Sequence, residues 1–234
     1  MITTYSSFEE CIQALTLHFK KAGNLTLAEG MAWYMKHQFV YYGIQAPTRK
    51  KIFAVYKPAL LSFIKQGQLE SIMLLMWEYD EREWQYCALE LMLASKKYWT
   101  TGTIDLIERL ILSKSWWDTV DHLGGKITGL FFYKFAQERQ TRIKLWIHHS
   151  NMWLNRSAII HQLIYKEKTD VDLLLACIKP HLHSKEFFLR KAIGWALRQY
   201  SRTDPNKVMD IVNSIPLSPL SKKEALRLIL SSKA

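Results

Sequence analysis

Apolar residues recur every three or four positions along most of the chain. Near the N-terminus, Phe8, Ile12, Leu15 and Phe19 follow this spacing, which places their side chains on one face of an α-helix. Glycine, proline and asparagine separate the apolar stretches, and no alternating run lies between hairpin turns. The pattern therefore predicts an all-α chain of many helices, each of roughly 10 to 17 residues, joined by short loops.

Two predicted helix starts carry the sequence of a capping box, in which serine is followed three residues later by glutamate. Ser7 precedes Glu10 in this way, and Ser221 precedes Glu224. Helices are therefore expected to begin at Ser7 and at Ser221. The segment 202–234 is expected to form a helix pair that closes the C-terminal end of the core.

A small-residue pattern recurs along the chain with a spacing of about 35 residues, typical of two-helix repeats. Its shared position is an alanine followed by an aliphatic residue, at Ala88, Ala158 and Ala192. Because a small side chain allows helices to pack closely, the repeat predicts buried alanines. We expect a helical-repeat solenoid of stacked antiparallel helix pairs, forming one domain over residues 1–234.

Equivalent positions of such repeats would form a stripe on one surface. Steps of 35 residues from Lys51 reach Tyr86, Asp121, Arg156 and Lys191. The alanine pattern selects Arg190 in place of Lys191 for the last step. The stripe predicts a concave, mostly basic face suited to a nucleic-acid backbone. Ordinary solvated residues on a loosely periodic helical protein remain the alternative.

The charge balance favours a polyanionic partner. Lys and Arg number 32 against 21 Asp and Glu, so the net charge is +11. A protein this basic often binds nucleic acid, although a solvated basic surface with no partner is also possible. A hydrophobic content of 49% supports a sizeable core.

Other sequence signals point to a cytoplasmic protein without cofactors. The N-terminus lacks a basic stretch followed by an apolar run, so no secretory signal is expected, and no apolar run is long enough to span a membrane. Cys11, Cys87 and Cys177 lie far apart and are expected to be buried thiols. No zinc spacing and no nucleotide-binding glycine pattern occurs, so neither a metal nor a cofactor is predicted.

Chemistry-bearing residues gather at the middle of the stripe. Trp117 and Asp121 are four residues apart and would share a helix face, as would Lys191 and Trp195. A carboxylate flanked by aromatic rings can stabilise the oxocarbenium-like sugar formed when a glycosidic bond breaks. Arg156 could hold the adjacent phosphate. A general acid is unnecessary if the leaving base is already cationic.

These residues stand in motifs that resemble the AlkD-like DNA alkylation repair glycosylases, a family built from HEAT-like repeats. The resemblance covers nearly the whole chain and depends most on Trp-Trp-Asp-x-x-Asp, ending at Asp121, and Ala-Ile-Gly-Trp, ending at Trp195. Further matching segments are 31–36, 43–47, 153–156, 165–168 and 184–188. His122 and the pair Gly124–Gly125 depart from the family pattern.

The resemblance implies roles for individual residues. The catalytic carboxylate is Asp121, Trp117 and Trp195 border the lesion nucleotide, and Arg156 meets the DNA backbone. Secondary DNA-facing positions are Tyr34 and Gln45, to which the stripe adds Lys51, Arg190 and Lys191.

The activity implied is excision of cationic N3- and N7-alkylpurines from double-stranded DNA, on an open surface without a base-flipping pocket. A monomeric, monofunctional glycosylase without lyase activity is expected, associated with the nucleoid when on DNA. Two alternatives stay open. One is a catalytically silent binder of unusual DNA structures, and the other is a helical-repeat scaffold for protein partners.

Overall fold

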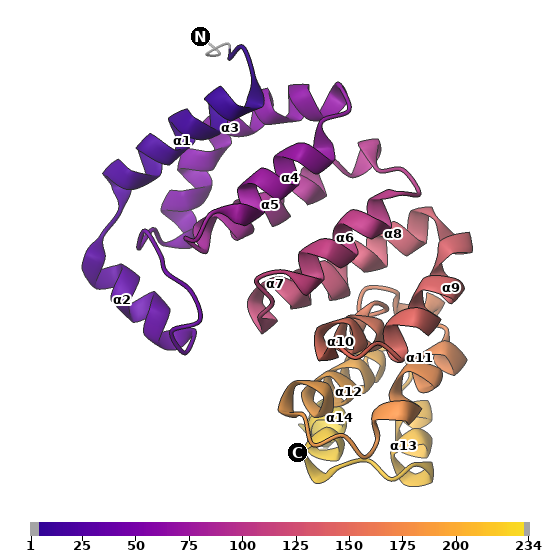
Figure 1. Ribbon diagram of the computed structural model, residues 1–234. Coiled ribbons are helices and arrows are strands. Elements are labelled where there is room, and N and C mark those ends of the chain that lie inside the picture. Colours follow the sequence, from indigo (N-terminus) through magenta and orange to yellow (C-terminus); the bar gives the residue numbers. More distant parts are fainter. Residues whose placement is uncertain (1–4, 232–234) are drawn as a thin grey trace. The chain divides into compact units, whose positions relative to one another are not determined.

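A computed structural model of the protein describes residues 5–231 (Figure 1). Its residue contacts divide the chain into two compact units, Met1–Thr100 and Thr101–Ala234. In the described residues, regular structure is helical apart from an isolated parallel bridge between Val40 and Glu81. This confirms the all-α prediction. The expectation of a single domain stays a prediction.

Unit 1 is built around its longest helix, α3. Its helices are α1 (Phe8–Ala22), α2 (Leu25–Tyr34), α3 (Ala46–Lys65), α4 (Leu69–Glu78), α5 (Glu83–Ala94) and the short η1 (Lys96–Tyr98). Helix α3 packs against α1 on one side and against α4 and α5 on the other. The buried positions of α1 are Cys11, Ile12, Leu15 and Phe19, which include three of the four apolar positions that predicted this helix.

Unit 2 contains a succession of stacked helices. They are α6 (Thr103–Leu112), α7 (Trp117–His122), η2 (Leu123–Thr128), α8 (Gly129–Lys134), α9 (Ala136–Ile147), α10 (Met152–Ile160), η3 (Lys166–Lys168), α11 (Val171–Ile178), η4 (Lys179–His181), α12 (Phe187–Tyr200), α13 (Pro205–Ser214) and α14 (Pro219–Ser231). Helices α10, α12 and α14 pack in succession, and α9, α11 and α13 contact this row (Figure 1). Ala158 and Ala192 lie fully buried within the row, as the repeat predicts, and Ala88 is fully buried in unit 1.

The two predicted capping boxes have different outcomes. Ser7 is the N-cap of α1 and its side chain accepts from the Glu10 amide, as predicted. The box at Ser221 is wrong, because α14 begins two residues earlier, at Pro219. The Ser218 hydroxyl accepts from the Ser221 amide, and the Ser221 hydroxyl donates to the Arg190 carbonyl oxygen. The predicted closing helix pair is present as α13 and α14.

A fully buried histidine makes the stability of unit 2 depend on pH. His161 packs edge-on against Phe132, and one ring nitrogen lies 2.7 Å from the Ala158 carbonyl oxygen. Burial lowers the pKa of His161 from its usual 6.5 to about 4. The folded state therefore excludes a proton that the unfolded chain binds below pH 6.5.

We expect the free energy of unfolding to fall by about 3 kcal/mol from this histidine as the pH drops from 6.5 to 4. Urea unfolding at several pH values measures it. His161→Gln is the control. It should remove most of the pH dependence of the free energy of unfolding and should change that free energy little above pH 7. A slope that is the same in both proteins would contradict this assignment.

Candidate active site

Asp121 and Arg156 form a two-pronged ion pair between α7 and α10. The Nε of Arg156 donates to Oδ1 of Asp121 at 2.7 Å, and Nη2 donates to Oδ2 at 2.8 Å. The remaining terminal nitrogen, Nη1, donates to the Phe188 carbonyl oxygen at 2.5 Å. Two helices and the start of α12 therefore fix the orientation of one carboxylate. The 35-residue repeat predicted that these two side chains would be neighbours.

Burial differs between the two partners of this pair. The Arg156 side chain is 5% exposed, whereas the Asp121 side chain is 20% exposed. A charged guanidinium at this depth needs its acceptors, because an unpaired buried charge is costly. Phosphate binding by Arg156 stays a prediction, since the structure directs its donors to Asp121 and Phe188.

A π-helical segment directly after α7 brings Asp121 close to α10. This segment, η2, contains the Gly124–Gly125 pair. A β-carbon on Gly124 would lie 2.7 Å from the Ser157 Oγ and 2.9 Å from the Ser157 Cα. Only glycine permits this approach, and Ser157 is the residue after Arg156. The glycine pair therefore sets the spacing between the two helices that carry the ion pair.

Gly124→Ala is expected to lower the free energy of unfolding by roughly 1–3 kcal/mol, because the added methyl group overpacks the α7–α10 contact. Chemical unfolding measures the change. Gly30→Ala is a matched control, since nothing lies within 4 Å of a β-carbon there. A helix-interior glycine in open space should gain about 0.5–1 kcal/mol on substitution by alanine. Equal effects of the two variants would argue against a tight contact at Gly124.

A hollow of about 310 Å³ opens beside the ion pair. Its lining residues come from α7, α10, α12 and α14: Trp117, Asp121, Arg156, Phe187, Phe188, Lys191, Trp195, Arg198 and Glu224. Trp117 and Trp195 are both partly buried, and both also line an adjoining hollow of about 500 Å³. The Asp121 carboxylate and both indole rings therefore line the same two hollows.

An aromatic cluster packs at the N-terminus of α7. One of its residues, Phe188, was assigned no role by the sequence. Phe188 lies with its ring centroid 5.3 Å from Trp116, the N-cap residue of α7, and 5.0 Å from Trp153. The guanidinium carbon of Arg156 is 5.9 Å from the Phe188 ring. Phe188 thus contacts the ion pair through both its ring and its carbonyl group.

A second carboxylate, to which the sequence analysis assigned no role in the site, lines the same hollow. Glu224 on α14 accepts from Lys191 at 2.7 Å and from Arg198 at 2.6 Å, and its side chain is 13% exposed. The hydrogen bond from Lys191 is the main cause that lowers the pKa of Glu224, and Arg198 adds to it. Lys191 and Arg198 stand on either side of Trp195 along α12, so Glu224 bridges the two cations that flank this indole.

Close packing at Gly194 allows this bridge, because a β-carbon there would lie 2.5 Å from the Glu224 Cβ. The predicted register is also resolved. Lys191 lines the hollow with Asp121 and Arg156, whereas Arg190 donates to the Lys185 carbonyl oxygen outside the lining. Glu224 follows Lys191 by about one repeat, which is the only sequence signal that could have located it.

The other predicted DNA-facing residues lie in unit 1. Tyr34 ends α2 and is 64% exposed, Gln45 is the exposed N-cap of α3, and Lys51 is exposed on the same helix. The buried carboxylate of Glu83 accepts from the backbone amides of Gly43 and Ile44, both at 3.0 Å, and so anchors the loop that leads to Gln45. Whether these residues meet DNA stays a prediction.

Several further features bear on the chemistry. Within residues 5–231, no group of three histidine, cysteine or acidic side chains could hold a metal ion. The three cysteines are buried, as predicted. Across the same residues, none of the helices combines the length and the apolar character that a membrane span requires.

Comparisons with known proteins point to one family. The sequence model of the family described as DNA alkylation repair enzyme matches residues 15–229. A solved structure, described as a predicted DNA alkylation repair enzyme from Enterococcus faecalis, is 35% identical with a TM-score of 0.80. The alignment covers 88% of this chain and 95% of that chain. A search of curated proteins gives no match.

Proposed function

The chain belongs to the DNA alkylation repair enzyme family, and from this premise we propose that it is a DNA glycosylase. Its substrates are N3- and N7-alkylated purines in duplex DNA, whose alkylation leaves the base positively charged. The reaction is hydrolysis of the N-glycosidic bond, which releases the free base and leaves an abasic site in an intact strand. DNA is the partner, and no cofactor takes part.

Asp121 is the catalytic group in this proposal. As the bond to the base breaks, positive charge develops on the deoxyribose, and a fixed carboxylate stabilises that charge more than it stabilises the neutral sugar. Arg156 holds both carboxylate oxygens in place, and each oxygen can accept further hydrogen bonds. Asp121 can therefore orient the attacking water as well.

The choice of substrate follows from the acid–base groups of the hollow. Glu224 is the other carboxylate in its lining, and it is held between Lys191 and Arg198. Those two ion pairs keep Glu224 ionised, so it does not serve as a proton donor at neutral pH. A base that leaves without protonation fits this arrangement, and N3- and N7-alkylpurines leave as neutral bases because they begin as cations.

Trp117 and Trp195 border the sugar of the lesion nucleotide. The face of an indole ring attracts a cation by about 0.5–2 kcal/mol, depending on desolvation. Two such indole rings in the hollow of the Asp121 carboxylate favour the cationic transition state over the neutral ground state. The observation that carries the proposal is this one carboxylate, pinned by a buried arginine in an aromatic-walled hollow.

Base release tests the proposal. Duplexes carrying N7-methylguanine or N3-methyladenine are incubated with the protein, and free base and strand length are both measured. The proposal predicts released methylated base and an unbroken strand that cleaves only on later alkali treatment. DNA binding without base release would instead support a catalytically silent binder, and absence of DNA binding would support a protein scaffold.

A further inference from the structure

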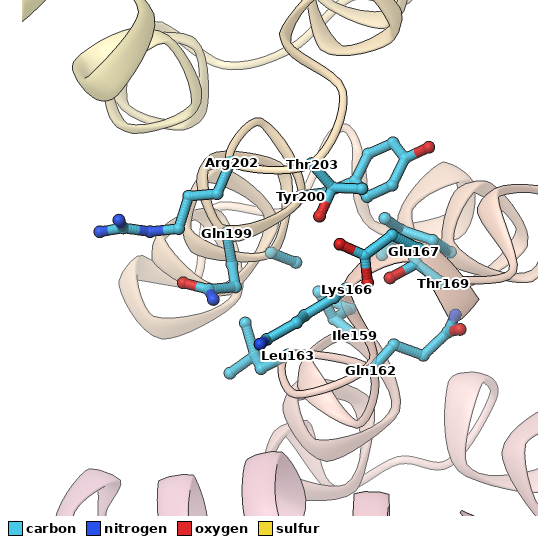
Figure 2. Close-up of a pocket in the computed structure, with 12 residues that line it drawn as sticks. Ile159, Gln162, Leu163, Lys166, Glu167, Thr169, Gln199, Tyr200, Arg202 and Thr203 are labelled. Carbon is cyan, nitrogen blue, oxygen red and sulfur yellow. The ribbon is translucent and has the colours of Figure 1, made fainter.

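A third hollow in unit 2 lies beside the candidate active site and has a different lining. It measures about 250 Å³ and is formed by the C-terminal end of α12 and the segment between α10 and α11 (Figure 2). Its apolar floor includes Leu163, and its polar wall includes Lys166, Gln199 and Arg202. Figure 2 shows these three polar side chains extending toward the same side of the hollow.

This hollow adjoins the active site, because a middle hollow shares lining residues with both. Leu163 and Gln199 line both the third hollow and the 500 Å³ hollow beside Asp121. That middle hollow in turn shares Trp117, Asp121 and Trp195 with the hollow of the ion pair. These three adjoining hollows, together called the groove, therefore extend from Glu224, past the catalytic carboxylate, to Lys166 and Arg202.

The cations at the two ends of this groove differ in their partners. At the active-site end, Arg156 pairs with Asp121, while Lys191 and Arg198 both pair with Glu224. At the other end, the ammonium of Lys166 and the guanidinium of Arg202 have no carboxylate within ion-pair distance among residues 5–231.

Lys126, in the middle hollow, is likewise unpaired within the described part of the chain. In the third hollow itself, Lys166 and Arg202 line the wall together with one acid, Glu167, so the cations exceed the acids there. Unpaired cations attract a polyanion most strongly, because no existing ion pair has to break.

The backbone at Lys166 supports a role for this residue. Its φ is +52°, in the left-handed region that non-glycine residues seldom adopt. Such a conformation costs about 1–3 kcal/mol and concentrates at functional sites. Gln162, which also lines the hollow, is occupied by two hydrogen bonds with the backbone of Asp170. The Gln162 side chain is therefore occupied, whereas the Lys166 ammonium is available to a ligand.

We propose that Lys166 and Arg202, with Lys126 between them and Asp121, bind phosphate groups of the DNA backbone at the end of the groove away from Glu224. This inference rests on the proposed function and adds to it. The DNA is anchored by cations one hollow away from the carboxylate, while the cations at the carboxylate itself are engaged in fixing the site. The ligand is a phosphodiester, which needs charge and hydrogen-bond donors and not an enclosed pocket.

The salt dependence of DNA binding tests this proposal. Binding is measured by fluorescence anisotropy with a duplex that carries a stable tetrahydrofuran abasic site, so that base release plays no part. Removing one cation that neutralises a phosphate should reduce the slope of log K against log salt by about 0.9. Lys166→Gln with Arg202→Gln should therefore make the slope shallower by about 1.8 and weaken binding about 60-fold near 0.1 M salt.

A second double variant controls for net charge. Lys207→Gln with Lys222→Gln removes the same charge from exposed positions on α13 and α14 that line none of the three hollows. Its slope should match the wild type. Equal slope changes in the two double variants would overturn the proposal. Because wild-type base release is measured separately, that result would leave the glycosylase function standing, and loss of base release in the wild type would leave this binding test unaffected.

Discussion

Asp121→Asn is expected to slow base release about a hundred- to a thousandfold, the usual loss when one preorganised electrostatic group is removed from an active site. Asparagine keeps the shape and can still accept a hydrogen bond from Arg156, but it has no charge to stabilise the sugar cation. Affinity for duplex DNA should change much less, because the carboxylate acts mainly in the transition state. Single-turnover release from N7-methylguanine DNA measures the rate, and binding to abasic-site DNA measures the affinity.

The control for this variant is its folded state, since Arg156 loses a charged partner. Circular dichroism and a chemical unfolding curve should show that the variant is folded at the assay temperature. Equal loss of binding and of rate would contradict a transition-state role for Asp121. An unchanged rate would exclude this carboxylate from the chemistry.

Arg156→Met is expected to lower the free energy of unfolding by about 3 kcal/mol, the low end for breaking a buried ion pair, because Asp121 keeps some solvent. Methionine fills much of the space but leaves the Asp121 carboxylate and the Phe188 carbonyl group without their donor. The rate of base release should fall as well, since the carboxylate is then free to rotate. Urea unfolding measures the first effect and single-turnover kinetics the second.

Lys57→Met provides the comparison for stability. Lys57 pairs with Glu90 at 2.9 Å, but their side chains are 30% and 28% exposed, so the expected loss is below about 1 kcal/mol. The double variant Asp121→Asn with Arg156→Met completes the cycle and should recover part of the lost stability, since no lone charge remains. Strictly additive losses would show that the two side chains are not coupled.

The apolar period predicts the helices well because most of them bury one face. The residues on that face recur every three or four positions in the sequence. The helix start at Ser221 fails for a local reason. Ser218 and Ser221 both precede acceptable helical residues, and Pro219 fits the first turn, so the earlier serine takes the capping role. Sequence alone does not rank two such caps, because the choice depends on the contact between Ser221 and Arg190.

The candidate site also contains residues that the sequence predicts and residues that it does not. The four-residue steps and the repeat period bring Trp117, Asp121, Arg156 and Trp195 together, because each depends on helix geometry or regular stacking. The contributions of Phe188 and Glu224 depend instead on how closely neighbouring helices approach. That distance is set by glycine contacts such as the one at Gly194, which a spacing pattern does not contain.

The central claim is that the Asp121 site breaks glycosidic bonds to bases that are positively charged before they leave. The most direct measurement compares release of N7-methylguanine with release of hypoxanthine, a neutral purine lesion, from otherwise identical duplexes under single-turnover conditions. The account predicts release of N7-methylguanine and no detectable release of hypoxanthine. Release of both bases at similar rates would contradict it, because a neutral purine requires a proton donor, and the two carboxylates that line the hollow are both paired with cations.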